Sequence, residues 1–393
     1  MRELASPPVE RAFVDEALLE AAWEPAGALV EEARATEEAA ANAGEALRAL
    51  VRLYGERGLL RLVTTEAFGG AAAAVSSRAL CLVRERLGHA SPLCELAFAM
   101  QGLGSYPMTH AALELGTPAA AELYLPRVVS GEAVAAFALT EPGAGTDLGG
   151  IVTTARREGD EYVLDGEKIY ISNAGVADVY VVFAATAPPG ERRRLSAFAV
   201  PADAAGLETA PQPVLGGHPI GRVLLDGVRV PAAMRLGEEG RGLGLALATL
   251  HRFRPTVGAA ALGFAQRALD EAVAHVKRRE QFGAPLAELP LVQARLADMA
   301  CELEAARLLV YRAAATLDAG EERGAVARTG SMAKLVATEA AQRVIDSAVQ
   351  LHGGSGVDTR GVVARLYEEV RALRIYEGTN DVQKLLIARE LLK

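Results

Sequence analysis

The feature that most constrains the fold of this chain is a change of residue rhythm that occurs twice. From about residue 10 to 130, alanine, leucine and charged residues recur with the spacing of amphipathic helices. From about 132 to 235 the pattern changes to short runs of β-branched and aromatic residues separated by turn signals. From 240 to the end, longer helical patterns return. This order predicts an α+β chain of several domains, helical at both ends and β in the middle.

Turn signals divide the middle region into candidate strands. We expect a hairpin across residues 158–160, joining runs at 151–157 and 161–164, and a turn at Asp165–Gly166. The remaining candidate strands cover residues 133–140, 168–172, 179–186, 195–200 and 223–225. Such a set suits a small antiparallel β-barrel.

Four apolar stripes at helical spacing mark the C-terminal region. Three of them begin near Leu262, Leu296 and Ala333, and the fourth covers residues 382–392. Four stripes of this length predict a four-helix bundle. The predicted domains are therefore an N-terminal helical domain at 1–130, a middle β-barrel at 131–236 and a C-terminal four-helix bundle at 237–393.

The overall composition excludes several classes of protein. A chain of 393 residues with 51% hydrophobic content can bury a large core, and this length suits two or three domains. The net charge of −9, with both signs interspersed, does not fit a nucleic-acid-binding surface. The longest basic run, Arg192–Arg194, reads as a solvated loop tip. No apolar stretch approaches the roughly 18 to 20 residues of a membrane span.

Cysteine usage and the N-terminus bear on the compartment. Cys81, Cys94 and Cys301 are unevenly spaced in apolar surroundings, so we expect buried thiols and neither a disulfide framework nor a structural metal. Residues 1–8 have no apolar signal core. These features predict a cytoplasmic protein.

One carboxylate, Glu377, is a candidate general base. It follows Ile375 and Tyr376 and precedes a turn that begins at Gly378. Apolar neighbours solvate a carboxylate poorly, which raises its proton affinity, and the glycine lets another molecule approach the backbone. Because a lone glutamate before a glycine is more often a solvated helix end, this hypothesis depends on motifs elsewhere in the chain.

A second motif runs from Phe137 to Asp147. A candidate strand ends at Thr140 and passes into a Pro-Gly turn whose amides and hydroxyls can hydrogen-bond a flat heteroaromatic edge or a carbonyl. An ordinary β-turn is the alternative. The glycines at 240–244 do not follow a strand and have no acidic partner downstream, so we read them as a loop before a helix.

Helix ends supply three further candidate ligand-binding positions. Gly353 and Gly354 follow a helical pattern, where they form a C-cap or allow a pyrophosphate to approach. Arg279 ends another helix, where an arginine compensates the dipole or clamps a diphosphate. Arg252 and Arg254 precede the helix-starting Pro255 and are placed to meet an anionic or polar ligand.

Together these motifs resemble the acyl-CoA dehydrogenase family. Residues 139–147 are similar to its first signature and residues 166–173 to its flavin-stacking strand. Residues 279–283, 350–354 and 375–380 match in order and spacing, as do 124–126 with 131–132, so the resemblance covers essentially the whole chain. It implies a helical domain, a β-barrel and a four-helix bundle, with FAD between barrel and bundle and the acyl thioester against the flavin.

The resemblance also assigns roles to individual residues. It implies that Glu377 is the catalytic base and that the protein is a homotetramer, a dimer of dimers. The implied FAD-binding residues are Phe137, Leu139, Thr140, Tyr170, Ser172, Arg279, Gln281, Phe282, Gln350, Gly353, Gly354, Thr379 and Asp381. Those from Arg279 to Gly354 would reach the FAD of a neighbouring subunit. The implied substrate-binding residues are Thr146, Phe253, Arg254, Tyr376 and Gly378.

The activity implied by the resemblance is the α,β-dehydrogenation of an acyl-CoA thioester to the trans-2-enoyl-CoA. Glu377 would remove a proton from Cα, and a hydride would pass from Cβ to flavin N5. In the family, a backbone amide, here that of Glu377, and a flavin ribityl hydroxyl polarise the thioester carbonyl. The electrons would then pass to an electron-transferring flavoprotein.

Several positions depart from the family pattern. Phe253 stands where some relatives carry the base, and since it cannot abstract a proton, this departure favours Glu377. His251 stands where an aspartate is common, and Pro290 replaces a usual glutamine near the FAD. Glu368 replaces a usual arginine, for which the sequence offers no physical reason.

Two other functions compete with this interpretation. One is a flavin oxidase or monooxygenase of the same fold that uses O₂, which Glu377 disfavours because a monooxygenase needs no such base. The other is a non-catalytic flavoprotein that binds a macromolecule, which the acidic balance disfavours. The acyl group is not specified, although the bulk of Phe253 favours a short, medium, branched or cyclic chain.

Overall fold

The computed structural model describes residues 13–191 and 193–393. The predictions for residues 1–8 and for Arg192 therefore lie outside the described residues. Contacts divide the chain into two compact units. Unit 1 comprises the residues up to Arg34, Ser76–Glu95 and His251–Lys393, and unit 2 comprises Ala35–Val75 and Leu96–Leu250.

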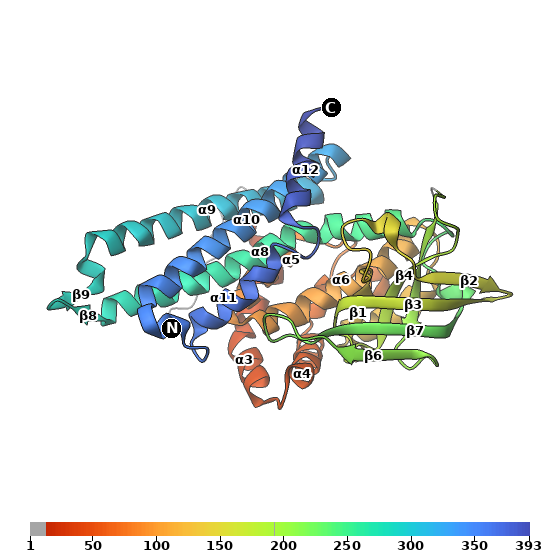
Figure 1. Ribbon diagram of the computed structural model, residues 1–393, viewed down its shortest axis with the longest axis horizontal. Helices are drawn as coiled ribbons and strands as arrows, with labels where there is room; N and C mark the ends of the chain where they lie inside the picture. The colour runs from red at the N-terminus through yellow and green to blue at the C-terminus, as the bar shows by residue number, and fades with distance from the viewer. Residues whose placement is uncertain (1–12, 192) are drawn as a thin grey trace. The chain divides into compact units, whose positions relative to one another are not determined.

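Unit 2 contains the β-sheet, the helices that come before the sheet in the chain and the start of the helix that comes after it (Figure 1). Its strands are β1 (Ala135–Ala138), β2 (Thr154–Glu158), β3 (Glu161–Ser172), β4 (Val179–Ala185), β5 (Leu195–Pro201), β6 (Leu207–Pro211) and β7 (Ile220–Pro231). Its helices are α4 (Ala43–Glu56), α7 (Ala119–Val129), the second half of α3 (Val30–Ala39), the larger part of α6 (Pro92–Glu114) and the start of α8 (Gly242–Arg278), up to Leu250. The sequence predicted these strands except β6.

Helix α6 packs directly on the first strand. The Gln101 amide donates to the carbonyl of Ala133 at 2.8 Å and accepts from the N–H of Ala135 at 2.8 Å. A Cβ on Gly104 would lie 2.8 Å from the backbone of Ala135, so the glycine permits this contact. One buried glutamine thus satisfies the strand edge beside the helix.

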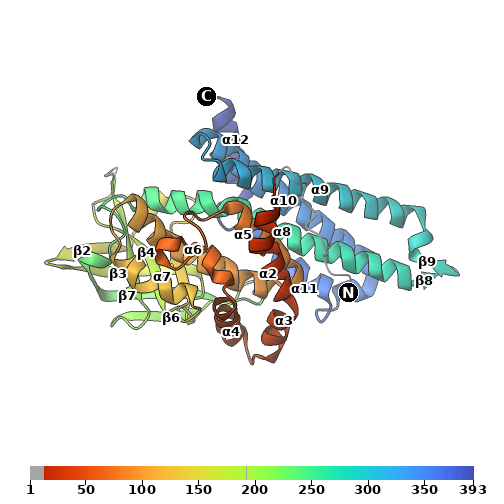
Figure 2. The same ribbon diagram turned by 180° about the vertical axis from the view of Figure 1, so that it is seen from behind.

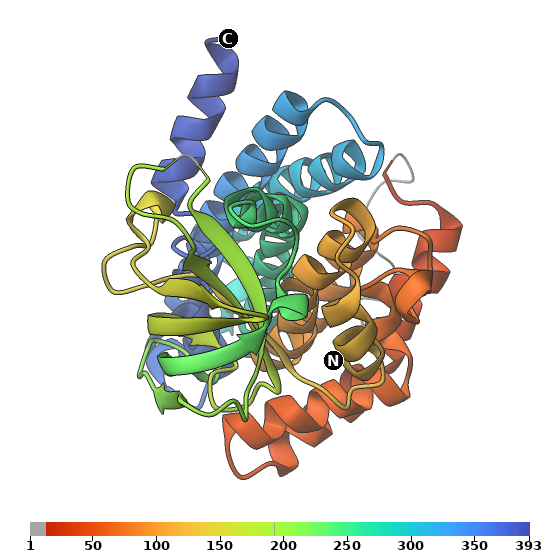
Figure 3. The ribbon, with the colours of Figure 1, turned by 90° about the vertical axis from the view of Figure 1, so that its right-hand side faces the viewer.

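The strands form one sheet in the order β1-β4-β2-β3-β7-β6, with β5 paired to the other edge of β4. Figure 3 shows its twist. The β2–β3, β3–β7, β6–β7 and β4–β5 pairings are antiparallel. The pairings of β4 with β1 and β2 are parallel, unlike the antiparallel arrangement expected. The chain between β1 and β4 is long enough to supply the crossover that a parallel pairing needs.

The hairpin predicted at residues 158–160 is present, with Glu158 opposite Glu161. The turn predicted at Asp165–Gly166 is wrong, because β3 runs on through it to Ser172. The register shifts between Leu164 and Gly166, which marks a β-bulge. A glycine within a strand fits a bulge as well as a turn.

Unit 1 is helical apart from a short two-stranded ribbon, as far as the described residues show (Figures 1 and 2). Its helices are α1 (Glu16–Leu18), α2 (Glu24–Ala28), α5 (Ser77–Ala90), α9 (Pro290–Asp318), α10 (Arg323–His352), α11 (Val362–Leu373), α12 (Asn380–Leu391) and, from His251 onward, α8 (Gly242–Arg278). The ribbon, β8 (Glu280–Gln281) with β9 (Ala284–Pro285), joins α8 to α9. The predicted fold class, helices followed by a β region and a helical C-terminus, is confirmed.

Small side chains let the long helices of unit 1 approach closely. Buried alanines line α8, α9 and α10, among them Ala261, Ala306 and Ala337. A Cβ on Gly258 of α8 would lie 2.7 Å from Val310 of α9 and 3.3 Å from Ala337 of α10. A larger residue at this position would push the three helices apart.

The fourth buried stripe of the bundle lies on α11. Its buried residues are Val363, Leu366, Val370 and Leu373. The stripe predicted at 382–392 belongs to α12, whose buried residues are only Asn380 and Gln383. An apolar stripe at helical spacing marks a helix face that can be buried. Whether this face is buried depends on how the other helices pack against it.

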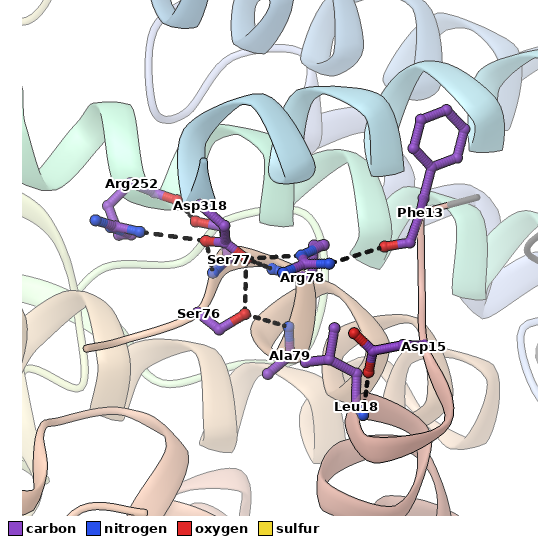
Figure 4. Close-up of polar contacts among 9 residues, drawn as sticks. All are labelled: Phe13, Asp15, Leu18, Ser76, Ser77, Arg78, Ala79, Arg252 and Asp318. Atoms are coloured by element: carbon purple, nitrogen blue, oxygen red, sulfur yellow. Dashed lines mark hydrogen bonds and ion pairs between the residues drawn. The ribbon is translucent and has the colours of Figure 1, made fainter. Parts of the chain in front are cut away.

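A single carboxylate joins three helices of unit 1 (Figure 4). Asp318, the last residue of α9, accepts hydrogen bonds from the N–H groups of Ser77 at 2.7 Å and Arg78 at 3.1 Å, at the start of α5. It also accepts from the Ser76 hydroxyl at 2.7 Å and Arg78 Nε at 3.1 Å, and lies 3.5 Å from Arg252 of α8. An anion is favoured at a helix N-terminus, so Asp318 fixes α5 and α8 to the end of α9.

Two further expectations concern cysteines and membranes. Cys81 and Cys94 are buried free thiols, but Cys301 is exposed, so the expectation that all three are buried is wrong for this residue. No helix within the described residues is long and apolar enough to cross a membrane.

Candidate functional site

The carboxylate of Glu377 is the most unusual polar group of unit 1. The residue lies in the loop between α11 and α12 and has a left-handed backbone, with φ 52°. Although the residue as a whole is partly exposed, both carboxylate oxygens are buried, and neither has a hydrogen-bond partner among the described residues. Burial raises the pKa of Glu377. A poorly solvated carboxylate with free oxygens suits a general base.

Three cations oppose this rise in the pKa of Glu377. They are Arg84 of α5, Lys334 of α10 and Arg254 of α8, while the nearby carboxylate of Glu95 adds to the rise. Burial outweighs the three positive charges, so the pKa stays above its ordinary value. The site therefore combines a desolvated carboxylate with positively charged surroundings, which favour an electron-rich group of a ligand.

The turn after Glu377 is held from two helices. Lys334 Nζ donates to the carbonyl of Gly378 at 3.1 Å and to Asn380 Oδ1 at 2.8 Å. The Gln383 amide donates to the same carbonyl of Gly378 at 2.9 Å. Burial lowers the pKa of Lys334 to about 8, although Glu377 partly restores it. These bonds fix the direction in which the Glu377 side chain points.

A second set of hydrogen bonds holds the side chain of Asn380. Its amide donates to Thr338 Oγ1 at 3.0 Å and to Glu339 Oε1 at 2.9 Å. Arg374 Nε also donates to Glu339 Oε1 at 2.9 Å, which closes the loop from the α11 side. The chain segment around Glu377 is thus fixed at both ends by α10.

The substrate residues predicted from the sequence fall in both units. Phe253 and Arg254 are buried on α8, and the Arg254 Nε has no hydrogen-bond partner among the described residues. Arg254 acts on Glu377, and Tyr376 adjoins it in the chain, so the structure brings these predicted residues together in unit 1. Thr146 lies exposed in unit 2.

His251 departs from the family pattern in charge as well as in identity. Burial, together with the nearby positive charges of Arg254 and Arg323, lowers its pKa to about 4. His251 is therefore neutral near pH 7 and does not supply the negative charge that the resemblance would place at this position.

The predicted FAD residues of unit 1 lie on exposed backbone. Arg279, Gln281 and Phe282 belong to the ribbon between α8 and α9, and Phe282 is 96% exposed with φ 55°. A Cβ on Gly353 or Gly354 would meet nothing within 4 Å, so the backbone there is open to a ligand.

The two FAD clusters of unit 1 share one end of the helical unit. His275 of α8 and His352 of α10 stack with ring centroids 4.3 Å apart. His275 is one helical turn before Arg279, and His352 immediately precedes Gly353. Gln350 is exposed on the last turn of the same helix. The stacked histidines therefore bring the two clusters close to each other.

The last two predicted FAD residues of unit 1 flank α12. The Thr379 hydroxyl accepts from the N–H of Val382 at 3.3 Å and caps this helix. Asp381 is exposed and lies 3.4 Å from Lys384.

In unit 2, a buried ion pair positions the predicted flavin-binding loop. Lys168 Nζ lies 2.7 Å from Glu141 Oε1 and donates to the carbonyl of Leu139 at 3.1 Å. The Glu141 carboxylate also accepts from the N–H groups of Val152 and Thr153. Burial lowers the pKa of Lys168 to about 8, while Glu141 opposes this change. The pair therefore holds the loop that follows β1 against strand β3.

This contact brings the predicted residues of β1 and β3 together. The N–H of Ile169 donates to the carbonyl of Thr140 at 2.9 Å. Tyr170, next in the chain, is 54% exposed and has a left-handed backbone with φ 54°. Phe137 and Ser172 are partly exposed nearby on their strands, whereas Leu139 is buried.

Sequence reasoning did not single out Arg84, Lys334 and the Lys168–Glu141 pair. A signal was present, because Arg84 follows four apolar residues of a helix and Lys334 adjoins the apolar stripe that begins at Ala333. A charge on an apolar face is rarely buried unless it is paired. Such a position therefore indicates a buried polar network.

Comparisons with known proteins agree with this architecture along the chain. The "Acyl-CoA dehydrogenase, N-terminal domain" family matches residues 16–132. The middle domain of the same family matches residues 136–228, and the C-terminal domain matches residues 240–392. The chain therefore belongs to the acyl-CoA dehydrogenase family of FAD-dependent oxidoreductases.

Three similar proteins illustrate the range of the family. A cyclohexane-1-carbonyl-CoA dehydrogenase of Geobacter metallireducens is 40% identical over 353 residues, which cover 89% of this chain and 90% of the relative. A chain in a structure described as the electron transferring flavoprotein of Acidaminococcus fermentans has a TM-score of 0.85 and 32% identity, covering 94% of this chain and 98% of that one. A glutaryl-CoA dehydrogenase of Mycobacterium smegmatis in complex with FADH2 has a TM-score of 0.84 and 26% identity, covering 97% and 95%.

The residues present fit an FAD cofactor. An isoalloxazine ring stacks on aromatic faces, and the exposed ring of Tyr170 offers one. A pyrophosphate needs close backbone approach and a cation, which the open Gly353–Gly354 segment and the exposed Arg279 offer. Within the described ranges, no cluster of three histidine, cysteine or acidic residues could hold a metal ion.

The turn that follows Glu377 gives a prediction about Gly378. Gly378 has φ 93°, and an added Cβ would lie 2.6 Å from Nε2 of Gln383, a buried side chain that holds the turn. Gly378→Ala should cost about 1 to 3 kcal/mol for the left-handed backbone and about 1 kcal/mol more for the displaced hydrogen bond. Chemical denaturation measures the sum.

Gly190→Ala is the matched control for this prediction. Gly190 also has φ 93°, but nothing lies within 4 Å of an added Cβ. It should show the backbone cost alone. Equal losses in the two variants would contradict the contact with Gln383.

Proposed function

We propose that this protein dehydrogenates an acyl-CoA thioester between Cα and Cβ, with Glu377 as the base that removes the Cα proton. The observation that carries the proposal is the buried carboxylate of Glu377, whose two oxygens have no hydrogen-bond partner among the described residues. A carboxylate in this state has a raised pKa and a free lone pair for a proton. Monooxygenase chemistry does not need such a group.

The chain's own residues act by orientation and electrostatics. Lys334 and Gln383 hold the turn so that the carboxylate keeps one direction. We propose that the backbone N–H of Glu377 donates to the thioester carbonyl, which makes the Cα proton more acidic. Arg254 and Tyr376 then contact the substrate beside the base. Bound FAD supplies the acceptor for the hydride that leaves Cβ.

The acceptor of the electrons is a second part of the proposal. We propose an electron-transferring flavoprotein, supported by the likeness to a chain in the structure that carries that name.

We also propose domain boundaries at 1–130, 131–236 and 237–393, and a cytoplasmic location. The three free cysteines support a reducing compartment.

The base assignment is tested by Glu377→Gln. The amide keeps size and polarity but cannot take the proton, so the rate of flavin reduction by acyl-CoA should fall about 10²- to 10⁴-fold. Stopped-flow absorbance under anaerobic conditions measures this rate. The flavin spectrum should still change on addition of substrate, because binding survives.

Glu302→Gln is the control for the removal of one carboxylate. Glu302 lies partly exposed on α9, where it pairs with Arg343. This variant should reduce its flavin at the wild-type rate. Near wild-type reduction by Glu377→Gln would place the base elsewhere.

The size of the acyl group follows from Phe253. Its side chain is fully buried on α8, directly before Arg254, whose charge acts on Glu377. We propose a short, medium, branched or cyclic acyl group, which the likeness to a cyclohexane-1-carbonyl-CoA dehydrogenase supports. Turnover of C4 to C8 or cyclic thioesters should exceed that of palmitoyl-CoA in a steady-state panel. Faster turnover of palmitoyl-CoA would refute this assignment.

The assembly is proposed to be a homotetramer in which one subunit completes the FAD site of another. The exposed apolar side chains of Phe282 and of Leu385 on α12 support it, because a neighbouring subunit would remove them from water. Arg279→Ala should lower the FAD content of the purified protein, measured as flavin absorbance per chain. The far-ultraviolet circular dichroism should not change.

Arg278→Ala provides the comparison, since Arg278 is exposed one position earlier and is not a predicted cofactor residue. It should retain FAD. A wild-type monomer that holds a full complement of FAD in sedimentation experiments would overturn the shared site.

A further inference from the structure

The charges of a buried ion pair on α5 and α6 act on the candidate base Glu377. Arg84 of α5 and Glu95 of α6 bond to each other through Arg84 Nε, and their side chains are 1% and 2% exposed. Arg84 Nη1 also donates to Thr256 Oγ1 at 2.6 Å, and the Thr256 hydroxyl donates to the carbonyl of Phe253 at 2.7 Å. Arg84 is thus held by one acidic partner and by one turn of α8.

This arrangement separates Arg84 from the base while leaving its charge in range. Of the charged groups near Glu377, Arg84 opposes the effect of burial most strongly. Even so, neither oxygen of Glu377 accepts a hydrogen bond from it. An untethered arginine would form a bidentate pair with a nearby carboxylate and block its lone pairs.

We infer that Arg84 is a positioning residue for the base: tethered by Glu95 and Thr256, it acts on Glu377 through space and sets the pH at which this carboxylate can accept a proton. The inference rests on the proposed role of Glu377 as base. Arg84 stabilises the anionic form of Glu377 without a hydrogen bond to it, so both carboxylate oxygens stay free to take a proton. Removal of the tether and removal of the charge therefore have opposite effects.

The other charged groups around Glu377 come from every neighbouring element of unit 1. The groups that act on it directly are Arg84 on α5, Glu95 on α6, Arg254 on α8 and Lys334 on α10. Tyr376 precedes it in the loop, and Glu339 and Arg374 act on Lys334. Lys334 is tethered to Gly378 and Asn380 in the same manner as Arg84 is to Glu95.

The test is an infrared titration of the FAD-loaded protein without substrate. The C=O band of the protonated Glu377 carboxyl is identified by its absence in Glu377→Gln, and its midpoint is followed with pH. Arg84→Met should move the midpoint up by about 1 pH unit, because a nearby positive charge is lost. Glu95→Gln should move it down, because an anion is lost and Arg84 is freed toward Glu377.

Arg307→Met is the matched control. Arg307 is 3% exposed and forms a buried pair with Glu85 at 2.9 Å in the same unit. The charges that act most strongly on Glu377 do not include it. Arg307→Met should lose stability as Arg84→Met does, yet leave the midpoint unchanged.

A double variant covers the case in which Arg84→Met does not fold. Arg84→Met with Glu95→Leu removes both charges and leaves no buried ion without a partner. Its midpoint should still rise, by less than in the single variant, because Arg84 acts on Glu377 more strongly than Glu95 does.

The pH profile of flavin reduction by acyl-CoA should follow the same order. At pH values below the midpoint, a rise of 1 unit lowers the rate about tenfold. Equal shifts in the Arg84 and Arg307 variants, or no shift in either, would overturn the inference. If Glu377→Gln still reduced its flavin, the proposed function would fail, while the infrared midpoints would still report whether Arg84 acts on Glu377.

Discussion

The removal of one carboxylate from water is the constraint on which the helical unit depends. Both oxygens of Glu377 are buried without a hydrogen-bond partner among the described residues, which is costly for a charged group. Nearby positive charges offset this cost, whereas hydrogen bonds to the carboxylate from the described residues do not. Arg84 and Lys334 act on the carboxylate while their own donors are used elsewhere. The arrangement sacrifices stability and leaves both carboxylate oxygens without a hydrogen bond from the described residues.

The same preference for tethered polar groups recurs in the β unit. Lys168 and Glu141 are buried together and hold the loop after β1 against β3. Neither belongs to the set of predicted cofactor residues, yet both fix the backbone from which that set projects. A fully satisfied buried pair specifies one loop conformation, because any alternative leaves a charge unpaired.

Left-handed backbone marks the candidate site in both units. Among the described non-glycine residues, positive φ occurs at Tyr170, Asn173, Phe282 and Glu377. Three of these four were predicted as catalytic or cofactor residues. Such a conformation costs about 1 to 3 kcal/mol and persists only where the surroundings enforce it. The strain at Glu377 is enforced by Lys334 and Gln383, which hold the following residue.

The sequence by itself determined the order of helical and β regions, the family, and the candidate residues near Glu377, because periodicity and motif spacing are local properties. It did not determine that β1 pairs with β4 in parallel or that α11 carries the fourth buried stripe. Nor could it reveal the role of Arg84, which follows from partners 11 and 172 positions away. Burial and charge pairing are set by segments remote in the chain, so only the tertiary structure decided which charges surround Glu377 and that its carboxylate forms no hydrogen bond with any of them.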